Sequence, residues 1–293
     1  MRDPQERLHW GAAPVPFLKW AGGKRQLLAQ LDALLPSRFD GYIEPFVGGG
    51  AMFFHLWNRA RIAQSAVLSD VNGELINCYR VIQDQAQLDD LLRCLRRHTT
   101  KAMEARYYYA VRSWDRDPRY MQLRSPVERA ARTIFLNHTC FNGLFRMNRK
   151  GQFNVPYGRW GKPPMVFSEP VLWACHHALR GVALHDAKYE SCARWARAGD
   201  LVYLDPPYVP LSVTASFTCY SGSPFGQDDQ RRLAALAAEL ADRGCMVMAS
   251  NSDTPLVREL YGKWRLVQVP ARRSINSKAS GRGFIEELVA LSY

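Results

Sequence analysis

The chain has no long hydrophobic run. None of its apolar stretches approaches the about 20 residues that a helix needs to cross a bilayer. Residues 1–10 are polar and charged, without the apolar centre of a signal peptide, and residues 1–12 resemble a flexible leader. Because 47% of the residues are hydrophobic, a core is still available. The sequence therefore predicts a cytoplasmic, globular protein that does not use a membrane as a partner.

Cysteine is sparse and follows no pattern. The seven cysteines are scattered and odd in number, and none forms a Cys-x-x-Cys pair. We therefore expect neither a disulfide framework nor a zinc site, and a reducing compartment fits best. His138 and the pair His176 and His177 have no companions at metal-ligand spacing, so we expect them to be structural and the protein to hold no metal.

Acidic residues are absent from residues 129–168. The net charge of the chain is +12, and residues 74–165 hold 17 basic and 8 acidic side chains, which is +9 of that excess. The acid-free stretch also holds large aromatic residues, among them Phe141, Phe145, Phe153, Tyr157 and Trp160. A basic run is often only a solvated face, but basic residues interleaved with aromatics favour a polyanion. No long amphipathic basic helix points to a membrane, so we expect nucleic acid.

The chain does contain a repeated alternation of short apolar strands and helices. We predict helices at 23–35, 51–60, 169–179, 188–198 and 228–243, and strands at 41–46, 65–69, 181–185, 201–204, 245–250, 264–269 and 285–292. This alternation predicts an α/β fold with a Rossmann-like sheet and helices on both faces. Residues 74–135 are helical and basic, and residues 140–165 have the composition of a hairpin. We therefore assign 14–73 and 166–293 to a catalytic domain, and 74–165 to an inserted, mainly helical domain with a β-hairpin.

A glycine-rich turn follows the first predicted strand. Glu44-Pro45-Phe46-Val47-Gly48-Gly49-Gly50 is neither Gly-x-Gly-x-x-Gly nor a Walker loop, so dinucleotides and triphosphates are disfavoured. Asp70 ends the next strand, where an acid accepts hydrogen bonds from ribose hydroxyls. A nucleoside-like cofactor without a phosphate fits this pattern, and S-adenosylmethionine meets that description. Trp20 and Lys24 flank a Gly-Gly pair; Lys24 either pairs with a cofactor carboxylate or is a surface residue of a helix.

The most informative segment is Asp205-Pro206-Pro207-Tyr208, which follows the strand predicted at 201–204. Two prolines end the strand, so the carboxylate and the ring lie on a stiff loop at the sheet edge. A carboxylate and a proline carbonyl can both accept from an exocyclic amine, and tyrosine offers a stacking face. The alternative interpretation is an ordinary surface turn.

The chain resembles the Dam-type (D12 class) adenine-specific DNA methyltransferases of the alpha group. The resemblance rests on six segments: FLKWAGGK (17–24), YIEPFVGGG (42–50), LSDVNGELIN (68–77), FNGLFRMNRKGQFNVPYG (141–158), DPPYVPLSVTASFTCY (205–220) and RSINSKASGRGFIEELV (273–289). Their order, with the cofactor motif first, the insert second and the tetrapeptide last, is that of the alpha group. The resemblance implies a methyltransferase sheet and a target-recognition role for the insert.

The resemblance also implies roles for individual residues. S-adenosylmethionine contacts match Trp20, Lys24, Asp70 and Asp205, and Glu44, Phe46, Gly48 and Gly50 belong to the cofactor motif. Asp205, Pro206, Pro207 and Tyr208 match the catalytic tetrapeptide. Arg146 matches a base-reading arginine, while Phe141, Asn142, Leu144 and Pro156 match wedge or base-contact positions. The commonest target in the family is GATC. One departure is Lys188, which stands before Tyr189 where many relatives carry an acid, although Asp186 is nearby.

These roles define a mechanism in which a target adenine flips out of double-stranded DNA. Asp205 and the Pro206 carbonyl would hold its amine for direct in-line methyl transfer, and Tyr208 would stack on the base. We predict phosphate contacts by Arg149, Lys150, Arg159 and Lys162. The loop at 276–282 either closes over DNA or cofactor or is a plain hairpin loop. We expect a monomer in the cytoplasm, associated with the nucleoid, that serves restriction–modification or DNA replication and repair.

Two other functions remain compatible with the residues. One is methylation of cytosine N4, RNA or a protein amide, although cytosine N4 enzymes often carry Ser in place of Asp205, and Asn-Pro-Pro-Tyr is absent. The other is a DNA-binding protein that has lost catalysis, against which the intact Asp205 and Lys24 argue. Cytosine C5 methylation is disfavoured because the sequence has no Pro-Cys dipeptide to supply the nucleophile.

Overall fold

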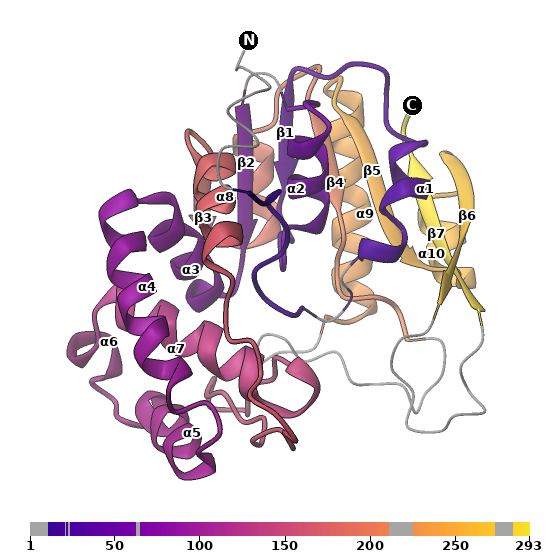
Figure 1. Cartoon of the computed structure of the whole chain (residues 1–293). Helices are drawn as coiled ribbons and strands as arrows, with labels where there is room; N and C mark the ends of the chain where they lie inside the picture. Colours follow the sequence, from indigo (N-terminus) through magenta and orange to yellow (C-terminus); the bar gives the residue numbers. More distant parts are fainter. Residues whose placement is uncertain (1–10, 21, 23, 63–64, 211–224, 273–283) are drawn as a thin grey trace.

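The computed structural model describes residues 11–20, 22, 24–62, 65–210, 225–272 and 284–293. Within them a seven-stranded sheet runs in the order β3-β2-β1-β4-β5-β7-β6 (Figure 1). The strands are β1 (Gly41–Glu44), β2 (Ser65–Asp70), β3 (Ala183–Asp186), β4 (Leu201–Leu204), β5 (Met246–Ser252), β6 (Arg265–Arg272) and β7 (Phe284–Leu291). The first five strands pair in parallel, and β7 lies antiparallel between β5 and β6. The sheet confirms the predicted α/β class.

Strand β4 shows how the sheet buries both of its faces. All four of its residues are buried, and they alternate between two hydrophobic clusters. Leu201 and Tyr203 face the cluster that includes α1 (Leu28–Asp32), α2 (Ala51–Asn58), α3 (Gly73–Gln83) and α8 (Glu169–Leu179). Val202 and Leu204 face α9 (Gln227–Asp242) and α10 (Pro255–Leu260). Helices therefore cover both faces, as the continuous apolar strand pattern predicts.

The segment between β2 and β3 carries the additional helices. They are α4 (Gln85–Thr99), α5 (Ala105–Arg112), α6 (Tyr120–Leu123) and α7 (Pro126–Thr139), and they gather beside the β3 edge of the sheet (Figure 1). Helix α7 begins with a capping box between Ser125 and Glu128, with Pro126 in the first turn. Its side chains are almost all buried, and α3 packs against both α7 and α8. The insert and the sheet therefore share one continuous hydrophobic cluster.

The segment after α7 forms the predicted hairpin in a minimal form. A 3₁₀ turn, η4 (Phe141–Gly143), follows α7 directly. Two isolated antiparallel bridges, Cys140 to Tyr157 and Met147 to Phe153, then hold the two arms together. Because few backbone bonds join the arms, the hairpin depends on side chains from the neighbouring helices.

Two predicted helices differ from the structure. Residues 23–35 form a 3₁₀ turn, η2 (Lys24–Gln26), followed by the short α1, because the Leu27 amide bonds to the Lys24 carbonyl three residues earlier. Residues 188–198 contain a 3₁₀ helix, η5 (Tyr189–Arg194), rather than an α-helix. A 3₁₀ turn places residues three apart on one face, which lets Tyr189 and Cys192 enter the same core cluster.

Several elements agree closely with prediction, and one was missed. Helix α8 and strand β4 have the predicted bounds, and α9 ends just before Gly244 as expected. Helix α10 was not predicted, although Thr254 caps it and Pro255 opens it. None of the helices in the described ranges has the length and hydropathy to span a membrane. The six cysteines in those ranges are free thiols, and Cys219 lies outside them.

Candidate active site

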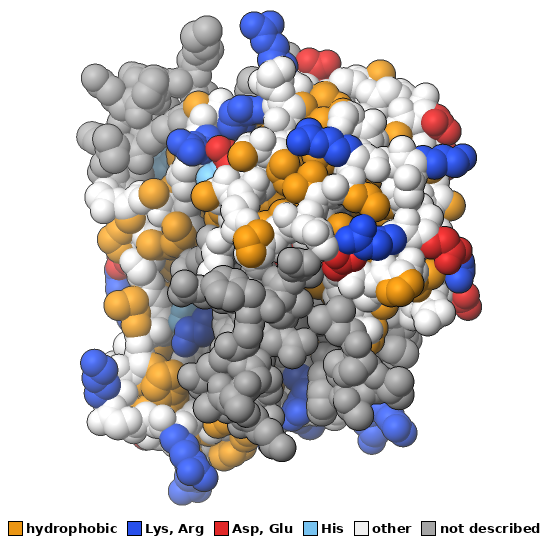
Figure 2. All heavy atoms as spheres, turned by 90° about the vertical axis from the view of Figure 1, so that its right-hand side faces the viewer, with side chains coloured by type: hydrophobic (Ala, Val, Ile, Leu, Met, Phe, Trp, Pro, Cys, Tyr) orange, Lys and Arg blue, Asp and Glu red, His pale blue; other side chains and the backbone are white. Residues whose placement is uncertain are grey.

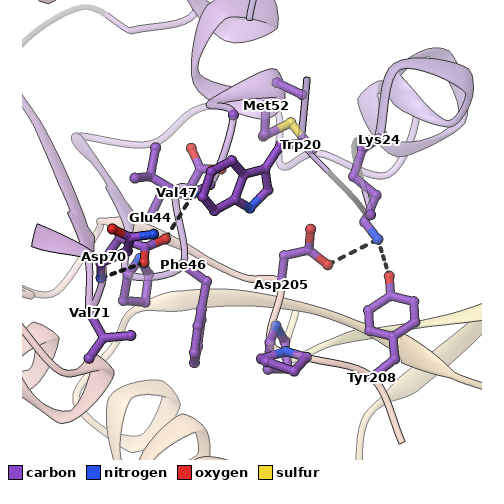
Figure 3. A pocket seen from close by; sticks show the side chains of 18 of the residues that line it. Trp20, Lys24, Glu44, Phe46, Val47, Met52, Asp70, Val71, Asp205 and Tyr208 are labelled. Atoms are coloured by element: carbon purple, nitrogen blue, oxygen red, sulfur yellow. Dashed lines mark hydrogen bonds and ion pairs between the residues drawn. The ribbon is translucent and has the colours of Figure 1, made fainter. Parts of the chain in front are cut away.

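One large cavity lies at the carboxyl ends of β1 and β4, with a volume of about 1110 Å³. Figure 3 shows Trp20, Phe46 and Asp70 on one side of the open space, and Lys24, Asp205 and Tyr208 on the other. From β1 the strand order runs to β2 and β3 on one side and to β4 and β5 on the other. Ligands bind at such a switch point in α/β sheets. The cavity brings together the predicted cofactor and tetrapeptide residues.

The glycine turn lets other side chains approach its backbone. Gly48 and Gly50 have φ of 47° and 69°, which is the left-handed region that favours glycine. A Cβ on Gly48 would lie 2.7 Å from the ring of Trp20, and a Cβ on Gly50 would lie 2.6 Å from the hydroxyl of Tyr79. The Tyr79 hydroxyl donates to the Gly48 carbonyl at 3.0 Å. Trp20 therefore lies against the turn that forms the cavity floor, and no larger side chain fits at Gly48.

Asp70, at the end of β2, is fixed by backbone donors. Its carboxylate accepts from the amide of Gly48 at 3.1 Å and from the amide of Asn72 at 2.9 Å. Burial raises the pKa of the Asp70 carboxyl to about 6. The carboxylate lines the cavity and keeps lone pairs for a ligand hydroxyl.

Aromatic side chains form the wall beside Asp70. Phe46 stacks on Tyr189 with ring centroids 5.4 Å apart, and the edge of Phe225 meets Phe46 at 6.0 Å. Lys188, the residue that departs from the family pattern, lines this cavity, whereas Asp186 lines a smaller neighbouring pocket. A flat ring that binds at this wall would contact the apolar rings of Phe46 and Tyr189, with the basic side chain of Lys188 nearby.

Lys24 and Asp205 form an ion pair on the opposite wall. The Lys24 ammonium lies 3.0 Å from Oδ1 of Asp205, and its side chain is only 6% exposed. Burial raises the pKa of the Asp205 carboxyl above its ordinary value, and the ammonium opposes that rise. Lys24 also contacts the Tyr208 hydroxyl and lies 4.1 Å from the centre of the Tyr208 ring (Figure 3). The prediction that Lys24 could be a surface residue of a helix is therefore wrong.

Two further acids near the pair, the buried Glu44 and the half-buried Glu287, each accept a hydrogen bond from a tyrosine hydroxyl. Glu44, at the end of β1, accepts from the Tyr42 hydroxyl at 2.8 Å, and burial raises its pKa well above the ordinary value. Glu287 on β7, which we did not single out from the sequence, accepts from the Tyr208 hydroxyl at 2.7 Å. The sequence signal for Glu287 is weak, because it is one of two adjacent glutamates, Glu286 and Glu287, in a strand whose other residues are apolar.

The residues that the resemblance assigns to DNA lie on the hairpin and its 3₁₀ turn. Those with exposed side chains are Phe141, Asn142, Arg146, Arg149, Lys150, Pro156, Arg159 and Lys162. Leu144 is half-buried, and together with Asn142 it lines the large cavity. Phe145 and Phe153 are buried, so these two aromatics of the acid-free stretch belong to the core. The insert therefore presents exposed basic side chains and touches the cavity that Asp205 lines.

The hairpin differs in charge from the side of the molecule that carries β6 and β7. In the view of Figure 2, the basic side chains are spread among acidic and apolar ones. On the hairpin, by contrast, residues 140–165 include no acid, and Arg146 is oriented by a hydrogen bond from its Nε to Oδ1 of Asn154 at 2.8 Å. Asn154 was not singled out from the sequence.

Asp115 supports the hairpin from below. This carboxylate accepts the backbone amide of Phe153 at 2.8 Å and pairs with the buried Arg132 at 2.7 Å. Tyr108 and Arg112 both donate to the carbonyl of Val155, at 2.8 and 3.0 Å. These side chains replace the backbone bonds that the short hairpin lacks.

Asn137 joins the hairpin region to the cofactor segment. Its fully buried amide accepts from the Lys19 amide at 2.7 Å and donates to the Lys19 carbonyl at 2.9 Å. It also donates to the Gly143 carbonyl at 3.3 Å. Trp20, which follows Lys19, packs against Phe145 with ring centroids 4.8 Å apart and the ring planes tilted by 31°. One side chain therefore fixes residues from both walls of the cavity.

The predicted structural histidines contact carbonyl groups. The His138 ring nitrogens lie 2.9 Å from the Phe17 carbonyl and 3.1 Å from the Met165 carbonyl, and His176 lies 3.0 Å from the Ile82 carbonyl. Within the described ranges, no cluster of three or more His, Cys, Asp or Glu side chains could hold a metal ion. The predicted loop at 276–282, and residues 211–224 of the polar loop after Tyr208, lie outside the described residues.

The doubly wound sheet, with a glycine turn and a large cavity at its switch point, is typical of α/β enzymes that bind a nucleoside-like ligand. A family profile described as D12 class N6 adenine-specific DNA methyltransferase matches residues 20–275. The chain belongs to this family, so it is an adenine-specific DNA methyltransferase. The resemblance to the D12 class is confirmed, and adenine is preferred to the cytosine, RNA and protein alternatives.

Named relatives cover almost the whole chain. It is 42% identical over 280 residues to the type II methyltransferase M1.LlaDCHI of Lactococcus lactis subsp. cremoris, covering 95% of each chain. It is 40% identical to the type II methyltransferase M.MjaIII of Methanocaldococcus jannaschii, covering 95% of this chain and 99% of the relative. It is 36% identical to the DNA adenine methylase of Escherichia coli K12, covering 94% of each chain.

Proposed function

We propose that this enzyme transfers a methyl group from S-adenosylmethionine to the N6 amine of adenine within GATC in duplex DNA. The observation that carries the proposal is the shared cavity: Asp205 and Asp70 line it together with Asn142 and Leu144 of the insert. At about 1110 Å³ it slightly exceeds the 300–1,000 Å³ usual for a single small ligand. A cofactor and an extruded base can therefore occupy it side by side.

The residues on one wall fit the cofactor. Asp70 is held by two backbone amides with lone pairs directed to the cavity, which suits ribose hydroxyls. Trp20 lies against the glycine turn, and Phe46 offers an apolar edge for a purine. When bound, S-adenosylmethionine supplies a methyl group on a positively charged sulfur, which is already a strong electrophile. Lys188 lines the cavity at the position where many relatives have an acid. We propose that the aliphatic part of its side chain contacts the cofactor adenine.

The tetrapeptide on the other wall fits the amine. We propose that the Asp205 carboxylate and the Pro206 carbonyl accept the two N–H bonds of adenine N6. This directs the nitrogen lone pair towards the methyl group, and positioning and electrostatics supply the catalysis. Tyr208 remains protonated because burial and the charges of Asp205 and Glu287 raise its pKa well above the ordinary value. Its ring is available to stack on the base.

The insert, residues 74–165, would recognise the DNA target. Extruding the base costs a few kcal/mol, which contacts by Phe141, Asn142, Leu144 and Pro156 would offset. Arg146, oriented by Asn154, can make a bidentate contact with a guanine edge. Arg149, Lys150, Arg159 and Lys162 are exposed and can reach phosphates. We continue to predict a monomer.

Transfer of labelled methyl from S-adenosylmethionine to short duplexes tests the proposal. One duplex contains GATC, one carries the scrambled tetramer, and Asp205→Ala protein is the control. Label on the GATC duplex alone, reduced at least about 1,000-fold in Asp205→Ala, supports both the target and the role of the carboxylate. Label on methylation-free plasmid DNA but on neither duplex would mean that the enzyme reads another sequence.

A further inference from the structure

Glu287 occupies an unusual place for a charge. It lies on β7, where it pairs with Ser252 of β5 on one side and Val269 of β6 on the other. The next four residues of the strand, 288–291, are apolar and buried, and the Glu287 side chain is 19% exposed. A charged group with so little access to water is stable only when it is paired. Its partners therefore indicate its role.

Both partners of Glu287 belong to the proposed amine-binding wall. The Tyr208 hydroxyl donates to Oε2 of Glu287 at 2.7 Å, and the Lys24 ammonium lies 3.3 Å from the same oxygen. The same ammonium lies 3.0 Å from Oδ1 of Asp205. Glu287 and Asp205 thus share one lysine. Three segments that are distant in sequence, η2, the loop after β4, and β7, therefore meet at the Lys24 ammonium.

Because Lys24 is shared, its ammonium binds the Asp205 carboxylate less tightly than it would with Asp205 as its single partner. An ammonium has three N–H donors, and here Asp205, Glu287 and the Tyr208 hydroxyl all lie within contact of it. Without Glu287, the lysine would have a single carboxylate partner and would close on Asp205. The carboxylate would then accept less readily from a substrate amine.

The bond to Glu287 also fixes the Tyr208 ring. The hydroxyl oxygen lies on the axis about which the ring rotates, so the bond from the hydroxyl to Glu287 fixes the direction of that axis, and the Lys24 ammonium restrains the rotation of the ring about it. The ammonium already lies 4.1 Å from the ring centre. The ring is thereby held before any base arrives, which lowers the ordering cost of stacking.

We propose that Glu287 is a positioning residue for methyl transfer. Its carboxylate accepts the hydrogen bond of the Tyr208 hydroxyl and shares the Lys24 ammonium with Asp205, so that the tetrapeptide is preorganised for the target amine. This inference rests on the proposed roles of Asp205 and Tyr208. It assigns no proton transfer to Glu287, whose contribution is geometric and electrostatic.

The charge of Glu287 gives the proposal a distinctive pH signature. The charged or titratable groups that interact with Asp205 among the described residues are Lys24 from η2, Glu287 from β7, Tyr42 and Glu44 from β1, and the tyrosines 203 and 208. Burial raises the pKa of Asp205 most, Lys24 lowers it, and Glu287 raises it further. Replacing Glu287 by Gln removes a negative charge, so Asp205 should ionise at lower pH. The acidic limb of the kcat profile should then move to lower pH.

The test compares Glu287→Gln, Tyr208→Phe, the double variant and the control Glu239→Gln, in which an exposed glutamate of α9 is changed. Activity is measured on plasmid DNA free of adenine methylation, which presents many sequences and does not depend on GATC. We expect kcat of Glu287→Gln to fall about 10- to 100-fold, with KM for DNA and cofactor within about 3-fold of wild type. The kcat of the double variant should be no lower than that of the less active single variant, because both substitutions remove the same hydrogen bond between Tyr208 and Glu287.

Two results would overturn the role of Glu287. One is a Glu287→Gln enzyme with the kcat and acidic limb of wild type; the other is a double variant whose losses multiply. If Glu287→Gln fails to fold, Tyr208→Phe decides alone, because it removes the same bond without leaving a charge unpaired: a kcat within about 2-fold of wild type would contradict the proposal. An enzyme that methylates plasmid DNA but not GATC duplexes would contradict the proposed GATC target. That result would not affect the comparison of the Glu287 variants with wild type.

Discussion

Two regions that line the cavity are built in different ways: the sheet edge around Asp70, which is the proposed cofactor wall, and the hairpin region with Asn142 and Leu144, which is the proposed DNA wall. On the cofactor wall, Asp70 and Glu44 are the last residues of β2 and β1, strands whose backbones pair in parallel with each other, and β1 also pairs with β4. On the DNA wall, four backbone hydrogen bonds and two isolated bridges join the arms of the hairpin, which form no regular strand. The sheet therefore positions its residues through repeated backbone bonds, whereas the hairpin relies on a few side chains from α5 and α7, and on Asp115.

This difference predicts how each wall responds to substitution. Loss of one side chain on the cofactor wall removes a ligand contact but leaves the backbone in place. Loss of one supporting side chain under the hairpin moves several exposed residues together. The experiments below can break or sharpen this contrast.

The largest effect is expected at Asp70. Asp70→Asn should weaken cofactor binding about 10- to 100-fold at pH 8, because a neutral amide replaces a carboxylate that accepts from hydroxyls. Since the Asp70 pKa is about 6, wild-type affinity should fall as the pH drops below 6 and stay level above it. Calorimetric titration from pH 5 to 8 checks both points. The variant should show no such pH dependence; a wild-type affinity that is level down to pH 5 contradicts the assignment. Asp242→Asn, at an exposed site, is the control.

A comparable effect on recognition is expected at Arg146. Arg146→Ala should lower the preference for the cognate site over a site with one changed base pair about 5- to 100-fold, since a bidentate guanine contact is worth about 1–3 kcal/mol. Competition between the two duplexes in one reaction measures the preference directly. Cofactor affinity should not change. An unaltered preference would mean that Arg146 does not read a base. Arg231→Ala, which replaces an exposed arginine of α9 that pairs with Glu259, is the control.

A smaller effect on DNA binding is expected at Asp115. Asp115→Asn breaks the pair with the buried Arg132 and weakens the bond to the Phe153 amide. We expect KM for DNA to rise about 10-fold, cofactor affinity to stay within about 2-fold, and the protein to lose about 3 kcal/mol of stability. Asp117→Asn, two residues away and exposed, is a matched control. Equal losses of cofactor and DNA affinity would show that the two walls do not differ as described.

The smallest effect is expected from the exposed cations. Lys150→Ala should weaken DNA binding only about 2- to 5-fold and should do so equally for all sequences, because a phosphate contact carries no sequence information. The slope of log affinity against log salt should become shallower by about 0.9. Binding measured by fluorescence anisotropy at four salt concentrations gives the slope. An unchanged slope would mean that Lys150 does not contact a DNA phosphate. Lys263→Ala, at another exposed lysine, is the control.

The sequence predicted the parts of the structure that local patterns encode. The glycine turn, Asp70 at the end of β2 and the tetrapeptide after β4 all follow from strand, turn and helix signals within a few residues. Asn137 and Glu287 could not be found this way. Asn137 bonds to Lys19 across 118 residues and Glu287 bonds to Lys24 across 263 residues, so no local pattern reports either contact.

The same reason explains the errors in secondary structure. Residues 189–194 have the composition of a helix, but the burial of Tyr189 against Phe46, on a distant strand end, selects the 3₁₀ form. Lys24 lies in a tight turn for a similar reason, because its partners are on β7 and on the loop after β4. Local preference was overridden by contacts that form only in the folded chain.

The shared hydrophobic cluster has a consequence for how the protein unfolds. Helix α7 of the insert and helices α2 and α8 on the sheet contribute to one cluster, and α3 packs against both α7 and α8. No boundary of weak contacts separates the insert from the sheet, so neither part retains its core alone. Heating should therefore melt the chain in a single cooperative transition, and an excised insert should not fold.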